Sequence, residues 1–117
     1  MVTYALLLSM IEVREYVDSK GCSAYAKWFD VLNARAAAKV AAVLIRMEQG
    51  NFSNAKGVGA GAFEYRIDFG PGYRVYFGKD GDKLVILLGG GTKKRQQRDI
   101  QNAQALWRDY KQRKSET

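Results

Sequence analysis

The chain of 117 residues has no histidine and a single cysteine, Cys22. This composition argues against a zinc site built from histidine and cysteine, and against a Ser-His-Asp triad or a Cys-His pair. A lone cysteine cannot close an internal disulfide, which fits a reducing cytoplasm as the place of action. The acidic residues are scattered over turns and helix faces, so we expect neither a bound metal nor another cofactor.

Long apolar runs are also missing. The apolar opening, residues 1–9, has no basic flank and is far shorter than the roughly 20 residues that span a bilayer, so we expect neither an export signal nor a membrane segment. Because Met10 directly precedes the first predicted strand, residues 1–9 are either an extension from an upstream start or the beginning of that strand. The length of the chain predicts one domain over residues 1–117.

Positive charge is concentrated near the C-terminus. The formal net charge is +7, and residues 93–117 hold eight basic against three acidic side chains, so this segment supplies +5 and the first 92 residues supply +2. A basic segment after a nearly neutral body is typical of a nucleic-acid-binding protein or of a protein that docks an acidic partner. A solvated helix face is the alternative.

Periodicity predicts a short strand and two helices in the first half of the chain. Alternation over residues 11–14 favours the strand. Ser23 is a candidate N-cap for the first helix, a break near Asn33 separates the second, and Gly50 ends it. The apolar positions recur at helical spacing: Tyr25, Trp28, Phe29 and Leu32, then Val40, Val43, Leu44 and Met47. We expect an antiparallel helical hairpin, with alanines where the helices approach each other.

A β-hairpin is predicted over residues 63–77. Apolar residues alternate with Glu64, Arg66 and Asp68, so one face of the first strand should contact the core while the other stays polar. With Pro71 at the centre of the turn, Asp68 lies opposite Arg74, and Arg66 lies opposite Tyr76. The apolar run at residues 84–88 predicts a central third strand, and a last helix is expected from about residue 95 to residue 113.

Two glycine-rich segments flank these strands. Residues 57–61 lead into a strand and lack a Lys-Ser/Thr ending, so they predict a flexible loop rather than a phosphate-binding loop. Residues 89–91 leave the third strand and precede a helix that Thr92 could cap, next to Lys93, Lys94 and Arg95. Free backbone N–H groups there would form an anion site, and a flexible connector is the alternative.

Arg66, Arg74 and Tyr76 share the polar face of the predicted hairpin. Guanidinium groups bind phosphate oxygens in pairs, and an aromatic ring can stack on an unpaired base, so the three residues are candidate RNA contacts. For Arg74, a simple cross-strand ion pair with Asp68 is the alternative.

The order of two helices, a hairpin, a third strand, a basic glycine exit and a last helix resembles the RelE/ParE superfamily of type II toxins over about residues 10–110. Within it, the chain is most similar to HigB-like addiction module killer proteins. The resemblance implies an α+β, RelE-like fold: a first short strand, a helical hairpin, a three-strand antiparallel meander and a C-terminal helix. It implies a metal-independent endoribonuclease that cleaves messenger RNA, commonly on the ribosome, and inhibits translation. The implied partner is a cognate antitoxin, expected to be a helix-turn-helix protein.

Carried over by position, the resemblance implies catalytic roles for Lys56, Arg66, Lys93 and Lys94. The further RNA-binding candidates are Arg74, Tyr76, Arg95 and Arg98. The last helix begins without the Tyr or His that serves as general acid in the family, so that role stays open among a lysine, Tyr76 and Tyr73. Two other functions also stay open, namely ParE-like inhibition of DNA gyrase and a non-catalytic basic nucleic-acid-binding module.

Overall fold

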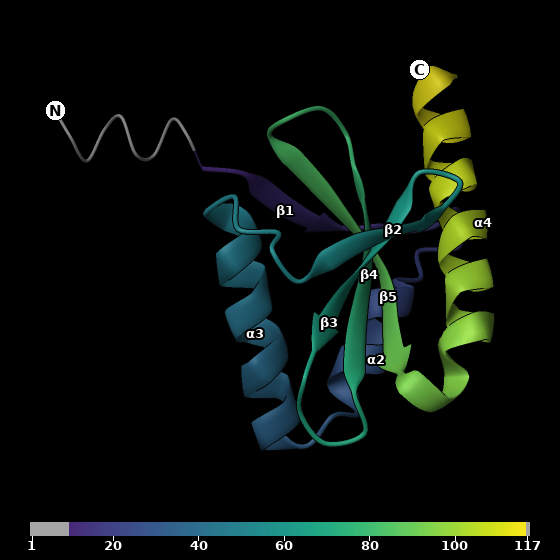
Figure 1. The fold of residues 1–117 in the computed structure, drawn as a ribbon. Coiled ribbons are helices and arrows are strands. Elements are labelled where there is room, and N and C mark those ends of the chain that lie inside the picture. The colour runs from purple at the N-terminus through teal and green to yellow at the C-terminus, as the bar shows by residue number, and fades with distance from the viewer. Residues whose placement is uncertain (1–9, 117) are drawn as a thin grey trace, which may run out of the picture.

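The computed structural model describes residues 10–116, and the proposed N-terminal extension at residues 1–9 lies outside them. The described chain has an α+β fold in which one sheet lies between helices on both of its faces (Figure 1). The elements are β1 (Glu12–Glu15), α2 (Ala24–Asp30), α3 (Ala34–Glu48), β2 (Ala55–Gly59), β3 (Ala62–Ile67), β4 (Tyr73–Lys79), β5 (Leu84–Thr92), a 3₁₀ turn (Lys93–Arg95) and α4 (Gln96–Ser115). No helix within residues 10–116 has the length and apolar character needed to cross a membrane.

The sheet has five strands in the order β1-β5-β4-β3-β2. Strands β2 to β5 form an antiparallel meander, and β1 joins β5 in parallel, so the sheet is mixed. The observed meander therefore has one strand more than the three predicted. The additional strand, β2, includes residues 57–59 of the segment predicted as a flexible loop. Its composition gives little strand signal, but it pairs along the edge of β3. Gly59, Ala60 and Gly61 all take positive φ (93°, 57° and 84°) and form the tight turn between the two strands.

The predicted boundaries of the first two helices are confirmed by their caps. The Ser23 side chain accepts a hydrogen bond from the Ala26 N–H (3.0 Å), and the Asn33 side chain accepts one from the Ala36 N–H (2.9 Å). Each helix makes its main contacts with the sheet, α2 with β5 and α3 with β1 and β3. The sheet is wide enough to give each helix its own apolar strip. Of the alanines predicted to face a helix, Ala38 and Ala41 are exposed.

Two apolar clusters hold the three layers together. Under α2 and α3, residues such as Val40 and Met47 pack against Tyr65, Val75 and Phe77 of the sheet. On the opposite face, α4 places Trp107 and Ala103 against Tyr76, Ile86 and Leu88. The face of the hairpin predicted to be polar is therefore covered by α4 over part of its length: Glu64 is 0% exposed and Tyr76 is 1% exposed, whereas Arg66 is exposed.

The register of the β3–β4 hairpin also differs from the prediction. Arg66 pairs with Arg74, and Glu64 pairs with Tyr76. This pairing centres the loop on Gly70 rather than Pro71, and Gly70 and Gly72 both adopt positive φ (55° and 79°). A shift of two residues leaves every side chain on its predicted face. It removes Asp68 from its place opposite Arg74, so the predicted Asp68–Arg74 cross-strand pair is wrong.

Gly89, Gly90 and Gly91 lie inside β5 and do not form a connector. A Cβ atom on Gly90 would overlap the Trp28 ring of α2, and one on Gly91 would overlap the Asp99 carboxylate of α4. The two glycines thus admit large side chains from opposite faces of the sheet. The Thr92 side chain makes no capping hydrogen bond, so the predicted Thr92 cap is wrong.

We expect Gly90→Ala to destabilise the protein by roughly 1–3 kcal/mol, because the added methyl group must displace the Trp28 ring. Thermal unfolding followed by circular dichroism measures the effect. Gly57→Ala is the matched control, since the nearest atom to a Cβ there belongs to the Phe63 ring at 4.0 Å. Equal melting temperatures for the two variants would contradict the close packing of Trp28 on β5.

Asp80 ties the end of α4 to the β4–β5 turn. Its carboxylate accepts hydrogen bonds from Lys114 Nζ (2.6 and 2.7 Å) and from the Tyr110 hydroxyl (2.5 Å). These hydrogen bonds lower the pKa of Asp80, and the bond from Lys114 has a larger effect than the bond from Tyr110. Because the folded-state pKa lies below the unfolded value, the carboxylate stabilises the fold above the unfolded pKa. That contribution is lost as the pH falls through the folded pKa.

We therefore expect Asp80→Asn to lower the melting temperature near neutral pH, and the difference from the unmodified protein to shrink as the pH falls below about 4. Melting curves over this pH range measure it, with Asp82→Asn in the same turn as the control. A difference for Asp80→Asn that stays constant with pH would show that its charge does not contribute.

Candidate functional site

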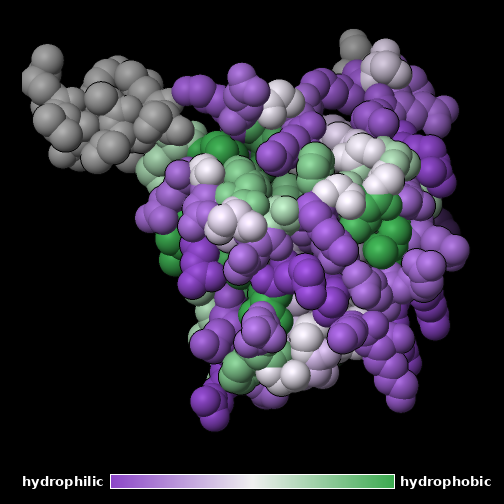
Figure 2. Space-filling view, viewed as in Figure 1, coloured by the Kyte–Doolittle hydropathy of each residue, from purple (hydrophilic) through white to green (hydrophobic). Residues whose placement is uncertain are grey.

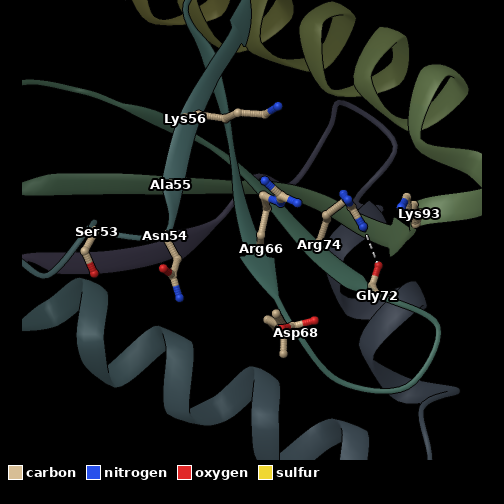
Figure 3. A pocket seen from close by; sticks show the side chains of 10 residues that line it. Ser53, Asn54, Ala55, Lys56, Arg66, Asp68, Gly72, Arg74 and Lys93 are labelled. Atoms are coloured by element: carbon tan, nitrogen blue, oxygen red, sulfur yellow. Dashed lines mark hydrogen bonds between the residues drawn. The ribbon is translucent and has the colours of Figure 1, made fainter.

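A cationic pocket of about 490 Å³ opens on the α4 side of the sheet, where β2, β3 and β4 approach the 3₁₀ turn (Figure 3). Figure 2 shows the surface from the same side as Figure 1. Hydrophilic residues cover the middle of the sheet and the length of α4, with smaller hydrophobic patches between them. The pocket is lined by Ser53, Asn54, Ala55, Lys56, Arg66, Ile67, Asp68, Gly72, Arg74 and Lys93. The lining thus contains four cationic side chains and one carboxylate, that of Asp68.

The four cations form a row across the sheet. Lys56 lies on β2, Arg66 on β3, Arg74 on β4, and Lys93 follows the end of β5, which is also the order of these strands in the sheet. Figure 3 shows the two arginines beside each other between the two lysines. Their order follows from the pairing of the strands in the folded sheet, since Lys56 and Lys93 are far apart in sequence.

The two arginines have different surroundings. Arg66 is exposed, whereas Arg74 is 4% exposed and donates from Nη1 to the Gly72 carbonyl (2.7 Å). They stand directly opposite each other on β3 and β4, where like charges repel unless an anion lies near them. Glu64 supplies a negative charge from beneath, with Oε1 lying 3.8 Å from Arg74 Nε. A phosphate entering from the solvent side would supply a second.

Glu64 was not a candidate from the sequence, because its alternation with apolar residues placed it on the face of the strand predicted to stay polar. In the structure, its carboxylate is fully buried and lies 3.8 Å from Lys56 Nζ as well as beside Arg74. One signal could have revealed it. A strand that is apolar on both faces, as at residues 84–88, requires cover on both faces, and the last helix is the element available for the second.

Lys94, Arg95 and Arg98 do not line the pocket. All three side chains are exposed at or near the start of α4, and Lys93 alone of the basic run at residues 93–95 lines the pocket.

Tyr76 and Tyr73 are both buried. Burial, and secondarily the charges of Glu64 and Asp99, raise the pKa of Tyr76, whose ring is covered by α4. Tyr76 therefore has no free face on which a base could stack. Tyr73 packs in the cluster on the other side of the sheet. Neither tyrosine faces the pocket, which leaves lysines as the proton-transferring candidates there.

The predicted backbone anion site is also changed. The Lys93 N–H is not free, because it donates to the Gly72 carbonyl at 2.9 Å. The cationic groups that line the pocket are side chains, those of Lys56, Arg66, Arg74 and Lys93. Among residues 10–116, no three histidine, cysteine, aspartate or glutamate side chains gather closely enough to hold a metal ion.

Two comparisons with known proteins cover this region. A family model described as "Phage derived protein Gp49-like (DUF891)" matches residues 27–108, which include every residue that lines the pocket. A Haemophilus influenzae protein, named only as an uncharacterized protein, is 44% identical to this chain over 91 residues. That match spans 77% of this chain and 92% of the relative.

The placement of Lys93, but not Lys94, in the pocket lining yields a test on binding. The log–log salt dependence of binding to a single-stranded RNA oligonucleotide has a slope of about −0.7 for each phosphate neutralised. We expect Lys93→Ala to flatten this slope by about 0.7 and Lys94→Ala to flatten it less, because Lys93 lines the pocket. Fluorescence anisotropy titrations at several salt concentrations measure both slopes. A larger change for Lys94→Ala would place the contact outside the pocket.

Proposed function

Because the chain belongs to the Gp49-like family of phage-derived proteins, within the RelE-like group of addiction module killer toxins, we propose that it is the toxin of a type II toxin–antitoxin system. We propose further that it belongs to the HigB-like branch and is a metal-independent endoribonuclease that cleaves messenger RNA in the cytoplasm, in association with the ribosome. The observation that supports this is the row of four cations, which four separate segments bring to one pocket.

The proposed reaction needs little beyond these groups. The ribose 2′-oxygen attacks the adjacent phosphorus and loses its proton to a base, while the bond from phosphorus to the 5′-oxygen of the next nucleotide breaks and that oxygen gains a proton from an acid. A 2′,3′-cyclic phosphate and a free 5′-hydroxyl result. Negative charge increases on the phosphoryl oxygens in the transition state. The guanidinium groups of Arg66 and Arg74 can donate hydrogen bonds to these oxygens.

The order of the row suits this geometry. The attacking and departing oxygens lie on opposite sides of phosphorus, so a base and an acid are needed on opposite sides too. With a phosphate beside the central arginines, Lys56 and Lys93 flank it (Figure 3). We propose that these two lysines move the protons, with Lys94, Arg95 and Arg98 holding the flanking RNA backbone.

The proposed partner is a cognate antitoxin, a small helix-turn-helix protein. An antitoxin that inhibits the toxin must keep RNA from the cationic pocket, and an acidic segment laid over the row would do so. A gene for such a protein beside the toxin gene would support the assignment.

We expect expression without the antitoxin to stop growth and to create new 5′ ends within cellular messages, which sequencing of RNA ends detects. Arg66→Ala should restore growth, because it removes an exposed phosphate ligand while changing the free energy of unfolding by only about 0.5 kcal/mol or less. Arg108→Ala, an exposed arginine elsewhere on α4, should remain toxic.

Two results would change this proposal. Intact messages with an induced DNA-damage response would favour gyrase inhibition instead. Arrest without either effect would favour a non-catalytic nucleic-acid-binding role.

A further inference from the structure

Next to the cationic pocket lies a polar layer formed by Glu64, Arg74 and Tyr76, which are buried, and by Gln96 and Asp99, which are partly buried. Glu64 and Tyr76 are cross-strand neighbours, and Arg74 pairs with Gly91, against which the Asp99 carboxylate rests. Gln96, in the first turn of α4, donates from Nε2 to Glu64 Oε1 at 2.9 Å. The layer therefore connects three strands with the start of the helix that covers them.

Arg74 requires a counter-charge at this depth. A guanidinium that is 4% exposed cannot be solvated fully, and a buried charge without a partner is strongly destabilising. Glu64, which is 0% exposed, is the carboxylate beside it, 3.8 Å from Arg74 Nε. At the other end of the guanidinium, Nη1 donates to the Gly72 carbonyl. Arg74 is thus held between Glu64 and the β3–β4 loop.

Glu64 also reaches a second cation of the row. Its Oε2 atom lies 3.8 Å from Lys56 Nζ, so one carboxylate lies near the cations on both neighbouring strands. Arg66 is on the same strand and the same face, two residues further along. Without Glu64, three like charges would stand side by side on β2, β3 and β4 and would repel each other.

The lengths of these contacts indicate what they do. A separation of 3.8 Å is within the range of an ion pair but too long for a hydrogen bond. Among the described residues, neither Glu64 Oε2 nor Arg74 Nε has a hydrogen-bond partner. The carboxylate therefore attracts both cations by charge without accepting a hydrogen bond from either. Arg74 Nε is itself buried, whereas Lys56 Nζ belongs to an exposed side chain and keeps its N–H donors for a phosphate.

We propose that Glu64 is a positioning residue of the pocket, whose buried negative charge holds Arg74 and Lys56 where their donors meet the reacting phosphate. Gln96 fixes the carboxylate itself and so makes α4 part of the site's support. This inference rests on the proposed function where RNA cleavage is measured. A second measurement tests it without RNA cleavage.

Glu64→Gln is the direct test, because the glutamine is of similar size and its amide oxygen can still accept from Gln96. We expect the rate of cleavage at saturating RNA to fall by on the order of tenfold or more, while the RNA affinity stays the same or rises, since the pocket has lost a negative charge. A purely structural role would lower the stability and the active fraction without this split. Asp30→Asn, exposed at the end of α2, controls for the change in net charge.

The arginine Nε–H resonances in a ¹H–¹⁵N NMR spectrum provide the second measurement, and they require no activity. In Glu64→Gln the Arg74 resonance should move more than that of Arg66. If the unmodified protein cleaves no RNA but the Arg74 resonance moves in this way, the proposed function fails and the positioning role stands. An unmoved Arg74 resonance together with an unchanged cleavage rate would overturn the positioning role.

If Glu64→Gln does not fold, Glu64→Asp is the substitute, because it keeps the charge and withdraws it from both cations by one methylene. We expect the aspartate variant to fold, to retain RNA affinity and to cleave several-fold more slowly than the unmodified protein at saturating RNA. Cleavage at the unmodified rate would overturn the proposal.

Discussion

The site depends on the close approach of α4 to the sheet. Trp107 lies against Gly78 of β4, where any Cβ atom would overlap the indole ring, and Asp99 lies against Gly91 of β5 in the same way. Glycine at these two positions lets the helix pack directly on the strand backbones. The apolar part of α4 and its polar first turns therefore reach the sheet together, and the polar side chains under those first turns lose their contact with water.

Burial of this polar region determines the chemistry available above it. Arg74 and Glu64 are both removed from solvent, so each requires the other, and the arginine is restricted to one place at the bottom of the cationic pocket. Arg66 and Lys93 remain exposed on the same side of the sheet. A ligand that enters the pocket would thus meet one arginine that is already fixed and other cations that can adjust. Such an arrangement reduces the conformational entropy lost on binding.

Local signals in the sequence predicted most of the elements correctly. The caps at Ser23 and Asn33 depend on bonds within one turn, so they can be inferred without tertiary structure. The register of the hairpin could not be inferred in this way, because centring the loop on Gly70 or on Pro71 leaves every side chain on the same face. Likewise β2, with two glycines and an alanine among its five residues, has little strand propensity and forms because the edge of β3 is free to pair with it.

For the candidate site, the sequence likewise indicated which residues take part but not how all of them are arranged. Lys56, Arg66, Arg74 and Lys93 were proposed from the sequence and the family resemblance, and the structure brings them to one pocket. Glu64 was overlooked, since a glutamate that alternates with apolar residues on a strand is ordinarily solvated. Tyr76 was proposed as a stacking surface for the same reason, and it is buried. Both misreadings have one cause, which is that sequence periodicity separates the two faces of a strand but does not say which element covers each.

With histidine absent from the chain and both candidate tyrosines buried outside the pocket lining, proton transfer there would fall to the lysines. The two lysines of the row differ in their surroundings, because Lys56 Nζ lies 3.8 Å from the buried Glu64 carboxylate. Lys93 lies at the other end of the row, where the pocket lining provides no equivalent buried carboxylate beside it. The two ends of the row are therefore unlike, and the proposed cleavage needs two unlike groups, one that accepts a proton and one that donates a proton.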